Sequence, residues 1–254
     1  MSQLLEDKLM TYSPYFVHGQ HRSSRWLITC DHATNTIPSD IGSGTLGLCK
    51  GDLKRHISYD IGAFGVALKL GKELKAPVLS TNFSRLIIDP NRGPQDPTLV
   101  MKLSDGTIIP SNKTVSKLEI ENRKTRFYWP YDQQLAQLCT RQNIVIISVH
   151  SFTRQLRGQK PRPWDIGILH TSDERIARPL IKLLSDSTKF RIGDNEPYSG
   201  HLPGDAIDRH ATRLGRPNAL LEIRNDLIET QKCQREMATI LAPFFEEALR
   251  ASKI

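Results

Sequence analysis

The sequence has little cysteine and no long hydrophobic run. Its 254 residues include four cysteines, and no two of them form a CxxC pair. Widely spaced cysteines of this kind are typical of free thiols, so neither a disulfide framework nor a structural zinc knot is expected. No apolar run approaches the about 20 residues that a membrane-spanning helix needs. We therefore predict no membrane partner.

The sequence also lacks a signal peptide, an internal repeat, a low-complexity tract and a linker between two halves. Glu6, Asp7 and Lys8 stand where a signal peptide would have a cationic start and an apolar core. We therefore expect one domain over residues 1–254 in the cytoplasm, with an irregular lead-in before Trp26. The sequence predicts no particular oligomeric state.

Positive charge is what the sequence has in excess. Lys and Arg number 35 against 27 Asp and Glu, which gives a formal net charge of +8. Such an excess suggests an acidic partner, either a polyanion or a small carboxylate or phosphate substrate. The basic residues are spread along the chain and no nucleic-acid-binding motif appears, so nucleic acid is the less favoured alternative.

Short apolar runs alternate with helical patterns along the chain. This alternation predicts an α/β fold with three α/β/α layers and a mixed, mostly parallel sheet. The strands that we expect are residues 26–30, 77–80, 86–88, 144–149, 165–169 and 218–223. The helices that we expect are residues 61–74, capped by Asp60, 116–140, interrupted near Pro130, 174–186 and 229–251.

Histidines follow two of the expected strands. His32 comes shortly after the strand 26–30, and His150 comes directly after the strand 144–149. Functional groups in open α/β sheets collect at the carboxyl ends of strands, so both imidazoles would lie at one edge if the strands are neighbours. Two imidazoles and a carboxylate make a usual catalytic zinc site. The alternative is a pair of hydrogen-bonded structural histidines.

A zinc site needs a third ligand, and the sequence leaves several choices. Asp60 is one candidate, but it is equally well placed to cap the following helix. Asn35 lies three residues after His32, but an amide is a poor zinc ligand. Asp31 is adjacent to His32, and neighbouring residues of a strand point to opposite faces.

The turn after residues 86–88 contains two residues suited to an anion. Arg92 offers a planar guanidinium fork that matches a carboxylate, and Asn91 adds amide donors. Arg85 lies earlier in the same segment. These residues are candidates for binding a substrate carboxylate, and a solvated turn is the alternative.

Glu222 is a carboxylate inside an apolar strand, where burial is costly unless the group is paired or used. One interpretation is an ion pair with Arg224, which shares its strand face two residues later. The other is a general base that accepts a proton from water. Arg224 would then be available for a substrate carboxylate.

These motifs, in this order, resemble those of zinc hydrolases. Residues 148–152 resemble the strand-end histidine motif of zinc carboxypeptidases, residues 89–92 their carboxylate-binding Asn-Arg pair, and residues 222–224 the segment with their catalytic glutamate. The sequence is more similar to the N-formylglutamate amidohydrolase family, which shares that fold. Its signature segments resemble residues 30–35, 56–62, 84–92 and 221–228.

The resemblance implies a phosphorylase/hydrolase-like (zinc carboxypeptidase-like) fold and one zinc ion, held by His32, His150 and Asp60. It implies that Glu222 acts as catalytic base and that the substrate is a small acidic N-acyl amino acid. For N-formyl-L-glutamate the products would be formate and glutamate. The substrate-binding residues expected from the motifs are Arg85, Asn91, Arg92 and Arg224.

One position departs from the carboxypeptidase pattern. Asn35 stands where those enzymes have a ligating glutamate. Cell-wall amidases with a related fold use an acidic ligand at the start of the following helix, and this analogy favours Asp60. His56 is a further candidate ligand or partner, whereas His170, His201 and His210 have no predicted role. The alternatives are therefore a zinc amidase or deacylase of another specificity, and a hydrolase fold without activity.

Overall fold

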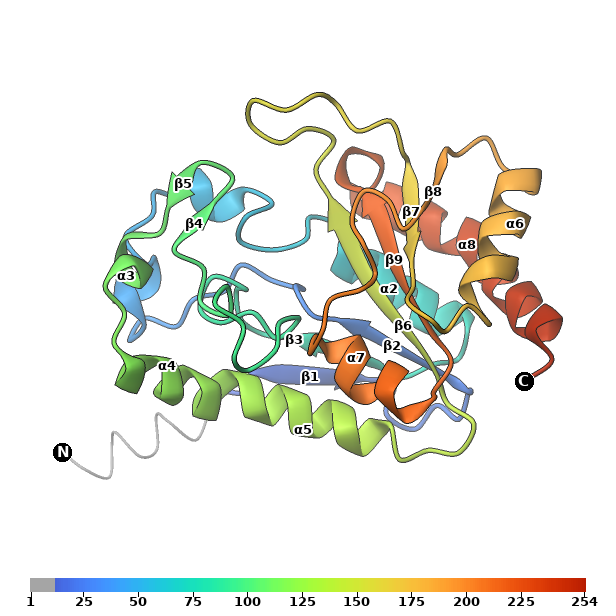
Figure 1. The fold of residues 1–254 in the computed structure, drawn as a ribbon, viewed down its shortest axis with the longest axis horizontal. Helices are drawn as coiled ribbons and strands as arrows, with labels where there is room; N and C mark the ends of the chain where they lie inside the picture. The colour runs from blue at the N-terminus through green and yellow to red at the C-terminus, as the bar shows by residue number, and fades with distance from the viewer. Residues whose placement is uncertain (1–11) are drawn as a thin grey trace.

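A computed structural model describes residues 12–254, so part of the expected lead-in, residues 1–11, lies outside the described residues. The described chain is built around a sheet of seven strands in the order β1-β3-β2-β6-β9-β7-β8 (Figure 1). The strands are β1 (Tyr15–His18), β2 (Trp26–Cys30), β3 (Val78–Thr81), β6 (Val145–Phe152), β7 (Ile166–Leu169), β8 (Ile192–Asp194) and β9 (Asn218–Arg224).

The central strands of the sheet run in one direction. β3, β2, β6 and β9 pair in parallel, and β8 pairs in parallel with β7. β1 is antiparallel to β3, and β7 is antiparallel to β9. Because parallel neighbours end at the same edge, the carboxyl ends of β2, β6 and β9 lie together. The predicted mixed, mostly parallel sheet is confirmed.

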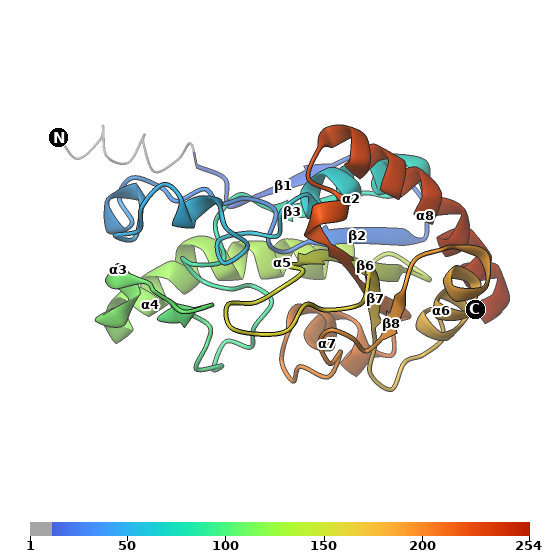
Figure 2. The same ribbon diagram turned by 90° about the horizontal axis from the view of Figure 1, so that it is seen from above.

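Helices cover both faces of the sheet, which makes three layers (Figure 2). The helices α2 (Ala63–Glu73), α6 (Ala177–Ser187) and α8 (Gln231–Ser252) cover one face. The helices α5 (Trp129–Leu138) and α7 (Ala206–His210) cover the other. The successive residues Leu27 and Ile28 enter different apolar clusters, one on each face. A strand buried on both faces reads as a continuous apolar run, which is why β2 and β6 stand out in the sequence.

The remaining elements are short. They are β4 (Leu103–Ser104), β5 (Thr107–Ile108), α3 (Pro110–Lys113), α4 (Lys117–Arg123), a π-helical turn (Lys124–Tyr128) and the 3-10 turns Gly42–Gly44, Asp52–Lys54, Thr212–Leu214 and Asn225–Leu227. Within residues 12–254 we find no helix that is long and apolar enough to cross a membrane.

Several local predictions were wrong. Residues 86–88 are buried but form a turn, in which the Ile87 amide donates to the Ser84 carbonyl at 3.0 Å. Their apolar character comes from packing in the core rather than from a sheet. By contrast, the prediction of a helix over 116–140 interrupted near Pro130 is confirmed: a π-helical turn separates α4 from α5, and Pro130 sits in the first turn of α5, where proline is tolerated. The expected irregular lead-in contains β1.

Candidate active site

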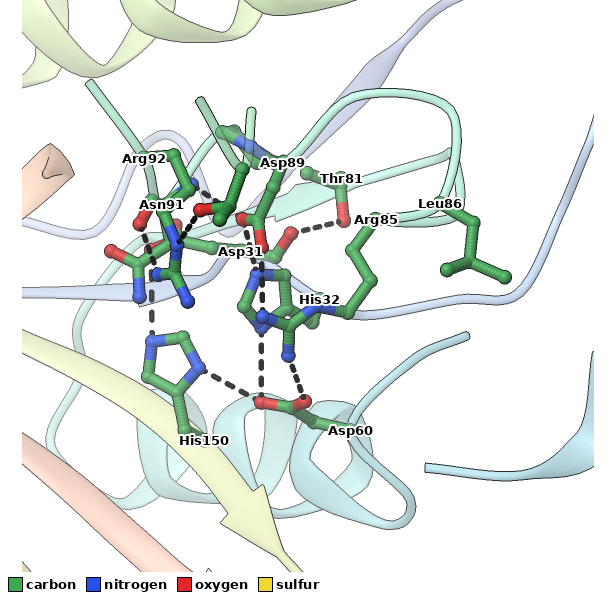
Figure 3. Close-up of polar contacts among 12 residues, drawn as sticks. Asp31, His32, Asp60, Thr81, Arg85, Leu86, Asp89, Asn91, Arg92 and His150 are labelled. Carbon is green, nitrogen blue, oxygen red and sulfur yellow. Dashed lines mark hydrogen bonds and ion pairs between the residues drawn. The ribbon is translucent and has the colours of Figure 1, made fainter. Parts of the chain in front are cut away.

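Three potential metal ligands meet at the carboxyl edge of the sheet. His32 follows β2, His150 lies in β6, and Asp60 precedes α2 (Figure 3). The Asp60 Oδ2 atom lies 3.2 Å from His32 Nδ1 and 2.8 Å from His150 Nδ1. Both histidines are only 2% exposed. The structure therefore brings together the three residues that the sequence singled out as ligand candidates.

The turn before α2 directs Asp60 toward the histidines. The Asp60 amide donates to the His32 carbonyl at 3.0 Å, and the Ser151 amide donates to Asp60 Oδ2 at 3.3 Å. Gly62 has a φ of 80°, and a Cβ there would lie 2.2 Å from the Ile228 carbonyl oxygen, so only glycine fits. Gly62, not Asp60, occupies the N-cap position of α2, and it has no side-chain cap. The prediction that Asp60 caps this helix was wrong.

A carboxylate contacts the outer nitrogen, Nε2, of His32, and a hydroxyl contacts that of His150. His32 Nε2 lies 2.7 Å from Asp89 Oδ1, and His150 Nε2 lies 2.9 Å from Ser148 Oγ, with Asp31 Oδ2 farther away at 3.7 Å. An outer carboxylate fixes the ring orientation of a metal-binding histidine. The Nδ1 atoms of both rings therefore face Asp60 Oδ2, and these three atoms are placed to share a cation.

The positive groups around Asp60 and Asp89 favour the ionised forms of these carboxyls. Burial acts to raise the pKa of Asp60, but His32 and His150 outweigh it and lower that pKa far below its ordinary value. Burial also acts to raise the pKa of Asp89, but Arg85 and His32 outweigh it and lower that pKa strongly. Arg85 Nη2 lies 2.7 Å from Asp89 Oδ2, and Arg85 Nη1 lies 3.4 Å from Asp60 Oδ1. The two carboxylates thus share one guanidinium.

Glu222 lies beside this network without an ion pair. It pairs in register with His150 across β9 and β6 and is only 7% exposed. Its Oε2 atom is buried and has no hydrogen-bond partner among the described residues. Burial raises the pKa of Glu222 to about 7, and the charge of Asp60 adds to this while His150 opposes it.

One cavity of about 480 Å³ connects these groups. Its walls include all three potential metal ligands and Glu222, together with Arg85, Asn91 and Arg92. A family model described as N-formylglutamate amidohydrolase matches residues 24–229, which covers every one of these residues. The chain belongs to the N-formylglutamate amidohydrolase family.

Solved structures share the fold of this chain. A gene product from Agrobacterium tumefaciens is 29% identical, with a TM-score of 0.90 over 96% of this chain and 97% of that chain. An N-formylglutamate amidohydrolase from Ralstonia eutropha JMP134 is 18% identical, with a TM-score of 0.69 over 95% of this chain and 98% of that chain. The second likeness is one of fold. A search of curated proteins returned no significant match.

The residues predicted to bind an anion, Asn91, Arg92 and Arg224, have different hydrogen-bond and ion-pair partners. The Arg92 guanidinium contacts only neutral oxygens, the Asn91 carbonyl at 2.8 Å and Thr98 Oγ1 at 3.2 Å. The Asn91 Oδ1 atom is buried without a partner among the described residues. Arg224 does not line the cavity. It lies 2.5 Å from Asp165 and 2.7 Å from Asp226, so the interpretation as a Glu222–Arg224 pair was wrong.

The remaining candidates lie outside the group of three ligands. The Asn35 side chain donates to the Leu53 carbonyl at 2.8 Å. His56 lines the cavity but faces Asp105 at 3.5 Å. His170 and His210 are bound to Asp194 and Asp132, and His201 lines the cavity.

Sequence reasoning missed three parts of the site. Asp89 was seen only as part of a turn, Asp31 was considered only as a ligand, and Tyr198 on the cavity wall was not considered. Asp31 and Asp89 could have been found from the sequence, since Asp31 is adjacent to His32 and Asp89 lies close to Asn91 and Arg92. Tyr198 has none, because only the folded chain brings its loop to the cavity.

Proposed function

We propose that this protein is a metal-dependent amidohydrolase that cleaves the amide bond of a small acidic N-acyl amino acid. N-formyl-L-glutamate is the first candidate substrate, with formate and glutamate as products. The observation that carries the proposal is the approach of two imidazole Nδ1 atoms and one carboxylate oxygen beside an unpartnered, buried Glu222 carboxyl. Membership of the family supports the same reaction class.

The residues present fit a zinc ion. His32, Asp60 and His150 supply two nitrogens and one oxygen, the ligand types of catalytic zinc sites, and leave one position open. Tetrahedral bonds of about 2.1 Å separate ligand atoms by roughly 3.4 Å. The observed separations of 3.2 and 2.8 Å need only small outward shifts. A bound zinc ion would polarise the amide carbonyl and lower the pKa of water from 15.7 toward ~7.

Glu222 is the proposed proton carrier. A general base works best when its pKa lies near the operating pH, and burial raises the pKa of Glu222 to about 7. Its free Oε2 atom accepts the proton of the attacking water. The same carboxyl then gives that proton to the leaving amine nitrogen, so that the carboxylate is restored at the end of the cycle.

Arg92 is the proposed anchor for a substrate carboxylate, with Asn91 beside it. Its guanidinium has no carboxylate partner among the described residues, so its charge is available. Arg85 also lines this cavity, but its charge is shared between Asp60 and Asp89. The role of Arg224 in substrate binding stays a prediction.

A panel of amides tests the proposal. The zinc-loaded protein is assayed with formyl, acetyl and larger acyl derivatives of glutamate and of leucine, before and after removal of zinc by a chelator. We expect the highest kcat/KM for N-formyl-L-glutamate, loss of activity on chelation and recovery on adding zinc. Full activity of the metal-free protein would remove the metal from the mechanism. A preference for larger acyl groups would replace the formyl specificity.

A further inference from the structure

A second cavity, of about 270 Å³, lies at the amino edge of the sheet. Arg25 directly precedes β2, Ile144 directly precedes β6, and Pro217 directly precedes β9. Because these strands are parallel neighbours, their starts meet at the edge opposite the candidate active site (Figure 1). Four arginines line this cavity, which we call the four-arginine pocket: Arg25, Arg141, Arg175 and Arg216.

Two of these arginines, Arg141 and Arg216, have no acidic partner among residues 12–254. Arg25 binds an oxygen of Ile254, the last residue of the sequence. Among the described residues no acidic side chain lines the pocket, although Asp173 pairs with Arg175 from outside it. The side chains that line the cavity therefore carry an excess of positive charge.

Main-chain oxygens hold these guanidiniums in place. Arg25 donates to the Asn143 and Ile254 oxygens at 2.9 and 2.7 Å, and Arg216 donates to the His210 oxygen at 2.7 Å. Arg141 Nη2 donates to the Ser24 oxygen. The acceptors of Arg141 and Arg216 are neutral carbonyls, which orient an arginine without cancelling its charge, so these two side chains are preorganised for an external anion.

Arg141 supplies a separate indication that a ligand belongs here. Its Nη1 atom is buried and has no hydrogen-bond partner among the described residues. An unpaired buried donor on a charged group is unfavourable, and such groups in folded proteins are nearly always satisfied. An anion in the pocket would provide the missing acceptor.

We infer that the four-arginine pocket binds a small ligand through a phosphate group. Guanidinium forks match the oxygens of phosphate in pairs, and arginine is the residue of choice for this recognition. A single carboxylate offers one charge to the two uncompensated cations of Arg141 and Arg216, whereas a phosphate or diphosphate offers two or more. Ile144 and Pro217 add an apolar wall for the remainder of a phosphorylated small molecule.

Calorimetric titration with pyrophosphate tests this inference. The zinc-loaded protein is titrated at constant ionic strength, with inorganic phosphate and glutamate as parallel ligands. We expect saturable binding of one pyrophosphate per chain in this pocket. Arg141→Gln and Arg216→Gln should each weaken binding at least about tenfold, or about 1.4 kcal/mol. Arg126→Gln is the matched control, because this arginine pairs with Asp40 elsewhere and its loss should leave binding unchanged.

The outcomes separate the inference from its rivals. Equal binding by the wild type and both pocket variants would overturn it, as would a lack of saturation at millimolar pyrophosphate. Glutamate binding as tightly as pyrophosphate would also contradict the phosphate assignment, and tighter binding of an oligonucleotide would point to a polymer instead. If Arg141→Gln does not fold by circular dichroism, Arg216→Gln and the thermal shift of the wild type by pyrophosphate decide the question.

Discussion

The two edges of the sheet differ in the charged side chains that they gather and in how these side chains are paired. At the carboxyl edge, Asp60 and Asp89 are surrounded by His32, His150 and Arg85, and each carboxylate has at least two positive or potentially positive neighbours. At the amino edge, two of four clustered arginines, Arg141 and Arg216, have only main-chain carbonyl acceptors among the described residues. The same parallel strands produce both clusters, because their starts and their ends each meet at one edge.

This difference shows what each edge is suited to bind. At the carboxyl edge, Asp60 Oδ2 lies 2.8 and 3.2 Å from two imidazole nitrogens, an arrangement of ligand atoms that suits a cation. At the amino edge, Arg141 Nη1 is a buried donor without an acceptor among the described residues, and an anion would supply one. The net charge of +8 is therefore not spread uniformly, since acidic side chains outnumber arginines in the lining of the first cavity and the lining of the second has arginines and no acidic side chain among the described residues.

Among the variants that test this comparison, Glu222→Gln should have the largest effect on activity. The amide cannot accept a proton from water, so kcat should fall by about 10²–10⁴-fold while zinc stays bound. Steady-state kinetics and metal analysis of the same preparation check both halves. Glu229→Gln is the control, because this glutamate is exposed and close in sequence. Full activity of Glu222→Gln with zinc bound would show that another group is the base.

Asp89→Asn should weaken metal binding by about 10–100-fold, because it removes the carboxylate that orients His32. Competition with a chelator of known affinity measures the change. Asp194→Asn is a matched control, since Asp194 makes a similar bond of 2.8 Å to His170 outside the ligand group. Equal losses in both variants would mean that general destabilisation, not ring orientation, is responsible.

Arg92→Ala should lower kcat/KM for N-formyl-L-glutamate by about 10-fold or more, the range for a hydrogen bond to a charged group. Arg224→Ala tests the prediction from the sequence that Arg224 also binds the substrate. Its guanidinium is held by Asp165 and Asp226 outside the cavity, so, against that prediction, we expect little change in kcat/KM. Arg141→Gln at the amino edge should leave kcat/KM unchanged. A loss in Arg141→Gln as large as that in Arg92→Ala would break the distinction between the edges.

Asp205 should give the smallest effect, on stability rather than activity. Its carboxyl lines the first cavity and accepts from the Asp208 amide at 2.7 Å, and burial raises its pKa to about 6. The folded state therefore holds a proton that the unfolded state releases, and this contribution to stability is lost as pH rises from about 4 to about 6.

Asp205→Asn should remove this loss of stability at higher pH, because the amide carries no charge that folding must bury. Relative to the wild type, its free energy of unfolding should improve by up to about 2 kcal/mol between pH 4 and pH 7. Urea unfolding of both proteins across this range measures the difference. A difference that does not change with pH would show that the carboxyl is ionised without cost.

The sequence predicts the sheet better than the turns, for a physical reason. β6 and β9 are buried on both faces, so their apolar runs are unbroken and easily recognised. Residues 86–88 are equally apolar but pack in the core as a turn, and hydrophobicity alone does not separate these cases.

The site shows a similar division. His32, Asp60, His150 and Glu222 could be proposed because polar residues at strand ends and inside apolar strands are conspicuous. The partners of Arg224, by contrast, follow from chain segments that the sequence does not place near it. The four-arginine pocket could not be predicted at all. Its residues lie far apart in sequence, and only the strand order brings them to one edge.

The metal content of the purified protein tests the central claim most directly. Elemental analysis of the wild type and of His150→Ala, prepared in parallel after zinc loading and dialysis, compares the intact ligand group with one that lacks an imidazole. His201→Ala is the control, since that exposed histidine lies outside the group. The account predicts about one zinc per chain in the wild type and in His201→Ala, and far less in His150→Ala. Equal zinc in all three proteins, or none in the wild type, would contradict it.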